Sequence, residues 1–299
     1  MSFANGLKSI IVATDLDGRS DAALEYARKL ALAYQARIVL AYGLDPLDYA
    51  AVENLPGRIR KGLPEEARAV LDQMTADLIR EGIHSHSEIR QGAVAQMLAD
   101  VVRQYEAGLI VLGTEGRQGA GPVIVGTVAE QLVRLAPCAV MAVAADWNAG
   151  SFRPTPGGPI LLAVEKNEST PAAVATASSL ATVFQRTLVV LHARRSAEAA
   201  AFLNPRGASL KEFGIEESSP FPIRYIVKDG PPEHAIANAI EQYRPSVLVV
   251  GAKRSSESAG PHGTAFLLLT CSRVPVICVP PDDSTGSIGK ETCASAAAL

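Results

Sequence analysis

The chain has 299 residues, of which 48% are hydrophobic, 20% charged and only 5% aromatic, and its formal net charge is -3. This balance excludes a strongly basic nucleic-acid-binding protein, and no apolar run reaches the ~18 residues that a membrane-spanning helix needs. An aliphatic core of this kind suits a parallel sheet covered by helices on both faces. We therefore expect no nucleic-acid or membrane partner. The length of the chain fits two domains of ~100–200 residues each.

The first half alternates between short apolar runs and helical patterns. Expected strands cover residues 10–14, 38–42, 86–90, 109–112 and 139–143. Expected helices cover residues 21–34, 65–81, 94–106 and 128–135. Ser20 suits the N-cap of the first helix, Pro64 the first turn of the second, and Gly82 the position after its end. Strands that alternate with helices predict βαβ units and a parallel sheet.

The second half repeats the order of the first. The apolar runs 10–15, 38–42, 109–113 and 137–143 recur in sequence as 160–165, 188–192, 247–251 and 275–279. The chain is therefore an internal duplication. We expect domains at 1–148 and 159–283, a linker rich in glycine and proline at 149–158, and a disordered tail at 284–299.

A glycine-rich loop joins the expected strand 109–112 to the helix 128–135. Glycine lacks a Cβ, so backbone N–H groups can approach a phosphate closely, and the N-terminus of the helix favours an anion. Thr127 and Arg117 would add a hydroxyl and a positive charge. The run Thr127–Glu130 also fits a capping box, which needs no ligand, so both interpretations remain open.

Asp15 ends the first expected strand, beside the crevice where open α/β sheets bind ligands. Its carboxylate can bind ribose hydroxyls or a metal ion on the phosphates, or it can stabilise a turn with Asp17 and Gly18. The sequence leaves these roles open. The four cysteines include no C-x-x-C pair, which favours free thiols and a cytoplasmic location.

These motifs resemble the universal stress protein family, here as a tandem of two domains. The pattern G-x-x-G, nine residues, G-[S/T] is met by Gly113, Gly116, Gly126 and Thr127. Asp15, Ser20 and the closing segment 128–140 add to the match. The resemblance implies two doubly wound α/β domains of the adenine nucleotide alpha hydrolase-like fold, each with a five-stranded parallel sheet in the order 3-2-1-4-5.

The same resemblance implies that the first domain binds ATP, or ADP or AMP, with a nucleotide-bound Mg²⁺ near Asp15. Adenine and ribose would lie on Ala13, Thr14, Asp15 and Tyr42. The phosphates would lie on Gly113, Thr114, Gly116, Arg117, Gly126, Thr127 and Val128. Family members often pair through their last strands, here 139–143 and 275–279, and this pairing can join the two domains or form a homodimer.

The second half departs from the glycine motif. Arg254 stands where the second glycine belongs, only eight residues precede Gly263, and Glu165 replaces Asp15. We expect Arg254 to block the phosphate cradle, although its charge could instead hold a phosphate in another pose. The second domain would then be regulatory or structural. In the first half, Glu115 places a carboxylate near the expected phosphates.

Three functions follow from these motifs. The favoured one is a cytoplasmic stress-response protein that binds an adenine nucleotide. The first alternative is a slow ATPase, although the chain has no Gly-Lys-[Ser/Thr] phosphate loop and no catalytic residues can be named. The second alternative is a nucleotide-free dimerisation scaffold.

Overall fold

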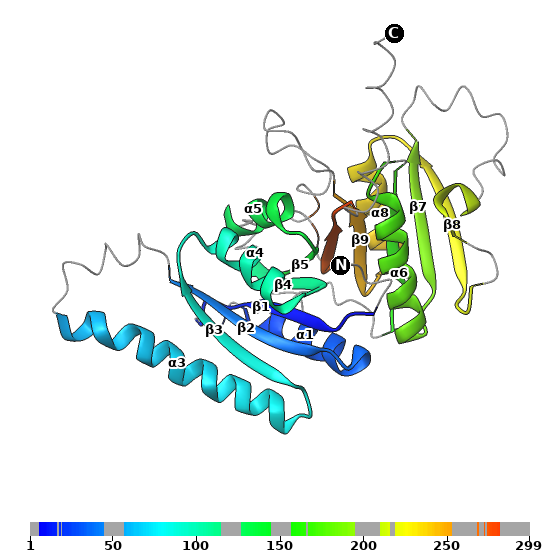
Figure 1. Cartoon of the computed structure of the whole chain (residues 1–299). Coiled ribbons are helices and arrows are strands. Elements are labelled where there is room, and N and C mark those ends of the chain that lie inside the picture. Colours follow the sequence, from blue (N-terminus) through cyan, green and yellow to red (C-terminus); the bar gives the residue numbers. More distant parts are fainter. Residues whose placement is uncertain are drawn as a thin grey trace, which may run out of the picture.

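A computed structural model describes residues 6–16, 18, 20–44, 57–114, 127–144, 157–165, 167–194, 210–215, 219–252, 268, 272 and 274–281. Within these ranges the strands form one continuous ten-stranded sheet in the order β3-β2-β1-β4-β5-β10-β9-β6-β7-β8. The two halves of the chain lie side by side along this sheet (Figure 1).

The first half forms a doubly wound unit. Its elements are β1 (Ser9–Ala13), α1 (Asp21–Tyr34), β2 (Arg37–Leu44), α3 (Gly57–Arg80), β3 (Ser85–Gln91), α4 (Val94–Tyr105), β4 (Leu109–Thr114), α5 (Thr127–Leu135) and β5 (Ala139–Ala144). All pairs within this half are parallel, and β1 lies between β2 and β4. The expected strand order 3-2-1-4-5 is confirmed.

The second half repeats this arrangement. Its elements are β6 (Ile160–Val164), α6 (Thr170–Phe184), β7 (Leu188–Arg194), the 3-10 helix η2 (Leu210–Phe213), β8 (Ile223–Asp229), α8 (Pro232–Tyr243), β9 (Val247–Gly251) and β10 (Val276–Val279). Strand β6 lies between β7 and β9, again with parallel pairing. The duplication predicted from the sequence is therefore present in the fold.

The closing strands join the two halves. β5 and β10 pair in antiparallel orientation, with Met141 opposite Ile277, which confirms the predicted pairing of the two halves within one chain. β5 is flanked by β4 and β10, and β10 by β5 and β9. A homodimer would have to use another surface, because neither closing strand keeps an open edge.

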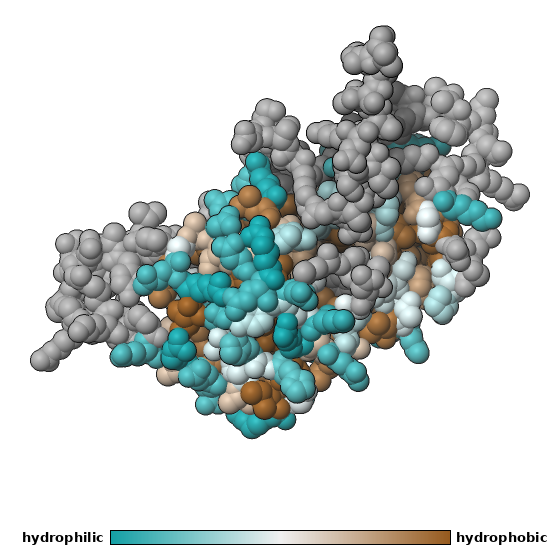
Figure 2. Space-filling model, viewed as in Figure 1, coloured by the Kyte–Doolittle hydropathy of each residue, from teal (hydrophilic) through white to brown (hydrophobic). Residues whose placement is uncertain are grey.

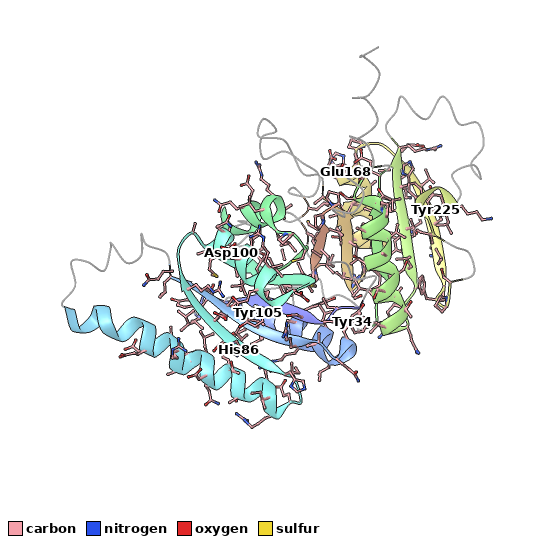
Figure 3. All side chains as sticks on the ribbon, viewed as in Figure 1. Tyr34, His86, Asp100, Tyr105, Glu168 and Tyr225 are labelled. Carbon is pink, nitrogen blue, oxygen red and sulfur yellow. The ribbon has the colours of Figure 1, made fainter. Side chains whose placement is uncertain are left out.

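One face of the sheet has a core that both halves share. Buried side chains of α1, α3 and α6 belong to a single hydrophobic cluster, which also contains Met141 and Ile277. Tyr34, labelled in Figure 3, lies where α1 meets α6, and its hydroxyl is 3.0 Å from Ser179 Oγ. The opposite face is divided between a cluster under α4 and α5 and another under α8.

Two predictions about the second helix have different outcomes. Gly82 follows the helix with φ +83, as expected of a glycine at that position. The predicted start near Pro64 was wrong, because α3 begins at Gly57 and Pro64 lies within it. Arginine, lysine and leucine dominate residues 58–63, and their high helix propensity favours extension of the helix on the N-terminal side of the proline.

The described helices include none that is long and apolar enough to cross a membrane. Figure 2 shows hydrophilic side chains over much of the visible face of the first half, with small hydrophobic patches between them.

Candidate functional site

The strand register brings the predicted nucleotide residues to one edge of the sheet. Ala13, the last residue of β1, is opposite Ala41 in β2 and Leu112 in β4. The N–H of Thr14 continues the pairing and donates to the carbonyl of Ala41 at 3.1 Å. The residues that follow each of these positions therefore meet at the carboxyl ends of three adjacent parallel strands, where ligands bind in open α/β sheets.

The predicted residues fall into two groups. Those described at or beside this edge are Ala13, Thr14, Asp15, Tyr42, Gly113, Thr114 and Val128, with Thr127 as the first residue of α5. Gly116, Arg117 and Gly126 lie outside the described residues, as do Glu115 and the side chain of Thr127. The geometry of the site is therefore built from the strand ends and the start of α5.

The turn after β1 contains a chain of hydroxyl groups that the sequence did not predict. Ser20 Oγ donates to Asp15 Oδ1 at 3.0 Å and is 2.9 Å from Thr14 Oγ1. Ser20 was expected to cap α1, and it does hold the N-cap position. Its side chain makes no capping hydrogen bond, because the hydroxyl turns instead toward the carboxylate of Asp15.

Leu16 in the same turn has φ 61, a backbone conformation that residues other than glycine rarely adopt. Its N–H donates to Thr14 Oγ1 at 3.2 Å, and its side chain packs against the core shared by both halves. Such conformations persist where the surroundings hold them, and they often occur at functional sites. Together, the hydrogen bond and the packing fix the backbone beside Asp15.

α5 is the helix that follows β4 in the chain, so it begins at the carboxyl edge of the sheet. The first turn of a helix has unpaired N–H groups and a partial positive charge, which suit an anion. Glu130, the acidic residue of the possible capping box, pairs with Arg134 at 2.9 Å. In the described contacts Glu130 therefore pairs with a residue one turn further along the same helix. The capping box and the phosphate site at the start of α5 both stay predictions.

The corresponding turn of the second half is closed by its own side chains. Ser169 is fully buried, and its Oγ donates to the carbonyl of Ala252 at 2.5 Å. The Ser169 N–H donates to Asn167 Oδ1 at 2.9 Å. A Cβ placed on Gly251 would lie 2.9 Å from Ser169 Cβ, so the turn is packed directly against the end of β9.

His192 occupies the place in β7 that Tyr42 occupies in β2. Its Nδ1 is 3.3 Å from the carbonyl of Val164, and its ring centroid is 5.5 Å from that of Phe213. These contacts give His192 a packing role. The described residues hold no cluster of three His, Cys, Asp or Glu side chains suited to a metal ion.

The described cysteines are also structural. Cys138 and Cys278 are free and buried. Burial raises the pKa of each thiol to about 12, so neither forms a reactive thiolate near neutral pH.

Comparison with known proteins assigns the first half to a family. Residues 6–144 match the universal stress protein family. A universal stress protein of Methanocaldococcus jannaschii is 28% identical over 141 residues, which cover 46% of this chain and 83% of that protein. Another from Mycolicibacterium smegmatis is 28% identical over 193 residues, which cover 61% of this chain and 63% of that protein.

A solved structure supports the fold of the whole chain. A universal stress protein of Archaeoglobus fulgidus superimposes with a TM-score of 0.73, and the match covers 91% of this chain and 98% of that protein. At 17% sequence identity this match bears on the fold alone. The tandem arrangement thus has a solved counterpart.

Proposed function

Since the first half of this chain, residues 6–144, belongs to the universal stress protein family, we propose that the carboxyl edge of its sheet binds ATP or a related adenine nucleotide. The observation that carries the proposal is the register of β1, β2 and β4, which gathers Asp15, Tyr42 and Gly113 at one edge. In this proposal the protein acts in the stress response as a cytoplasmic nucleotide-binding protein, and the second half has a structural or regulatory role.

The residues fit the chemistry of an adenine nucleotide. The exposed carboxylate of Asp15 is a hydrogen-bond acceptor for ribose hydroxyls. Tyr42, half-buried in β2 at the same edge, has an aromatic ring suited to the base. The start of α5 offers backbone N–H groups and a helix terminus for the phosphates. Bound Mg²⁺ would neutralise phosphate charge, and Asp15 is the residue that would face it.

The experiment is a titration of ATP into the purified chain and into Gly116→Arg, which introduces the residue type of Arg254 at the second motif glycine. We expect the wild type to bind and the variant to bind at least about tenfold more weakly, since that loss needs only about 1.4 kcal/mol. Asn238→Arg adds the same charge at an exposed position of α8 and should leave binding unchanged.

Equal binding by the wild type and Gly116→Arg would contradict the first-half site. Phosphate release measured in the same samples separates the binding protein from the ATPase. A turnover within the common range of about 1–1000 per second would favour the enzyme. Wild-type protein that binds no adenine nucleotide, with or without Mg²⁺, would leave the nucleotide-free scaffold as the better function.

A further inference from the structure

We infer that Ser20 is a positioning residue that gives the site its selectivity for ribose over deoxyribose, by holding the Asp15 carboxylate toward the ribose 2′-hydroxyl. The inference rests on the proposed function, and it assigns a task to a residue outside the glycine motif. Ser20 is 6% exposed and is the N-cap of α1, while Asp15 lies in the turn that follows β1. The side chain therefore connects a helix of the core to the ligand edge of the sheet.

The hydrogen bonds of the turn run in one direction. A serine or threonine hydroxyl has a single proton to donate. Ser20 gives its proton to Asp15 Oδ1 at 3.0 Å, so Thr14 must be the donor in the 2.9 Å contact between the two hydroxyls. Thr14 Oγ1 in turn accepts the N–H of Leu16 at 3.2 Å. The three hydrogen bonds therefore run in one direction, from the Leu16 N–H through Thr14 and Ser20 to the Asp15 carboxylate.

A series of hydrogen bonds that all run in the same direction holds the acceptor at its end in place. Successive hydrogen bonds polarise one another, and an ionised carboxylate accepts hydrogen bonds without donating any. Thr14 and Ser20 are both buried, so water cannot easily replace them. Asp15 itself is exposed at the ligand edge. A ligand that approaches this carboxylate must bring a donor, and a ribose hydroxyl is a donor whereas a deoxyribose 2′-position is not.

The second half contains a natural counterexample. Thr170 stands 150 residues after Ser20, as Glu165 does after Asp15, and its hydroxyl donates to the backbone carbonyl of Glu165. Because that hydroxyl has one proton, it has none left for the Glu165 carboxylate. The same oxygen also accepts the N–H of Asn167 at 3.3 Å. The hydroxyl in the second half therefore closes its own turn, whereas the hydroxyl in the first half directs a carboxylate.

The test measures the affinity for ATP and for 2′-deoxy-ATP by calorimetry. We expect the wild type to prefer ATP by about tenfold, the size of one hydrogen bond to a charged group. Ser20→Ala should lower the affinity for ATP by about that factor and leave 2′-deoxy-ATP nearly unchanged, so the preference disappears. Ser20→Thr keeps the hydroxyl and should restore part of the preference. Thr170→Ala is the matched control in the second half and should keep it in full.

A cycle with Asp15→Asn separates positioning from general structural damage. Asp15 is exposed, so this change should leave the fold intact while it removes the ribose preference. Adding Ser20→Ala to Asp15→Asn should then cost almost nothing further, because residues in one network act together. A wild-type preference retained in Ser20→Ala, or fully additive losses, would overturn the inference alone. Failure of the wild type to bind either nucleotide would overturn both the inference and the proposed function.

Discussion

The turns after β1 and β6 occupy equivalent places in the two halves, yet their hydroxyl groups have different partners. In the first half Ser20 donates to the side chain of Asp15. In the second half Ser169 and Thr170 donate to the backbone carbonyls of Ala252 and Glu165. Both halves nevertheless build the same strand order. The fold therefore does not require a hydroxyl at this turn that donates to a carboxylate side chain.

This difference bears on what a duplicated fold preserves. The backbone bonds made by Ser169 and Thr170 stabilise their own turn and draw it against β9. The side-chain bond made by Ser20 stabilises the turn less directly, and it fixes a charged group that faces outward. A hydrogen bond that directs a charge outward is better explained by a ligand than by folding.

The largest effect is expected where the halves are joined. Ile277 is fully buried and pairs with Met141 across the junction of β10 and β5. Ile277→Ala should lower the free energy of unfolding by about 2–5 kcal/mol, through lost burial and the cavity left behind. Because the cluster around Ile277 includes residues of both halves, we expect one cooperative transition in urea, followed by circular dichroism and amide exchange.

Val183→Ala is the control, since Val183 is 38% exposed on α6 and surface changes usually stay within about 0.5 kcal/mol. Two separate transitions in Ile277→Ala, with the first half still folded after the second half has melted, would mean that the halves are energetically independent despite their shared sheet.

A smaller loss of stability is expected where the turn after β6 packs against the end of β9. A Cβ on Gly251 would come within 2.9 Å of Ser169 Cβ, so Gly251→Ala should cost about 1–3 kcal/mol through overpacking. In a Ser169→Gly background the same change should cost less, because the opposing Cβ is gone. Thermal unfolding of the four proteins measures this coupling. Equal costs in both backgrounds would show that the turn does not press on β9.

Nucleotide affinity in these four proteins also tests the comparison between the halves. The substituted residues lie after β6 and at the end of β9, and the proposed site lies at the ends of β1 and β4. We therefore expect the affinity for ATP to remain at the wild-type value in all four proteins. A change in affinity would indicate that the second half influences the first-half site.

Much of this fold could be predicted from the sequence, since apolar runs mark buried strands and the duplication repeats their order. The strand ends near Asp15, Tyr42 and Gly113 followed from the same runs. The contacts of Ser20 could not be predicted, because a serine before a helix normally caps it. Its actual partner depends on the unusual φ of Leu16 and on the burial of Thr14, and neither is visible in a local pattern.

The contacts of the turn after β6 could not be predicted for a different reason. The sequence comparison pointed to Arg254, which lies outside the described residues. The contacts that close the turn come instead from Ser169 and Ala252, far apart in the chain. Long-range contacts of this kind follow from the fold and not from spacing, so only a structure could identify them.

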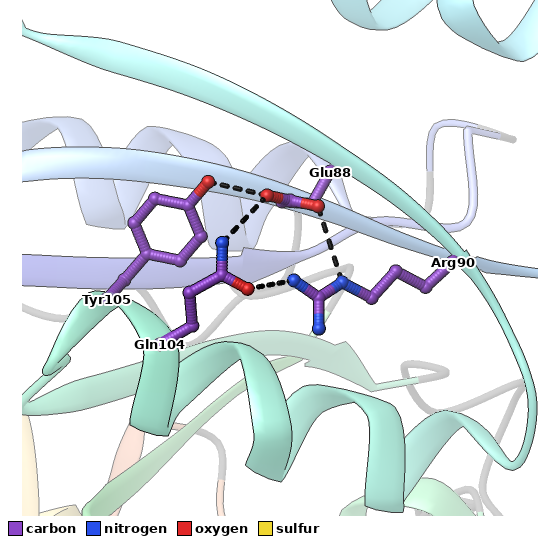
Figure 4. Close-up of polar contacts among 4 residues, drawn as sticks. All are labelled: Glu88, Arg90, Gln104 and Tyr105. Atoms are coloured by element: carbon purple, nitrogen blue, oxygen red, sulfur yellow. Dashed lines mark hydrogen bonds and ion pairs between the residues drawn. The ribbon is translucent and has the colours of Figure 1, made fainter.

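The outer edges of the sheet show another difference between the halves. Glu88 on β3 accepts hydrogen bonds from Tyr105 Oη at 2.5 Å, Gln104 Nε2 at 3.4 Å and Arg90 Nε at 3.3 Å (Figure 4). In β8 the position that corresponds to Glu88 is Ile226, as the strand registers with β2 and β7 show. The edge strand of the first half thus carries a charged network at a position where β8 has an apolar residue.

The smallest predicted effect concerns this network and depends on pH. Burial raises the pKa of Glu88, but the hydrogen bond from Tyr105 and the pairing with Arg90 outweigh burial and hold the pKa below its usual value of 4.5. A lowered pKa in the folded state stabilises the protein above pH 4.5, and this stabilisation is lost as the pH falls through the folded value. Glu88→Gln should therefore lower the stability by about 1 kcal/mol at pH 7.

The difference between wild type and Glu88→Gln should shrink steadily below pH 4.5, because protonation of Glu88 removes the same charge that the substitution removes. Urea denaturation at pH 7, 5, 4 and 3 measures it. Ile226→Leu in β8 is the matched control, and its effect should be the same at every pH because no charge is involved. A stability difference for Glu88→Gln that stays constant down to pH 3 would show that the network acts through packing, and that the two edges differ in shape rather than in charge.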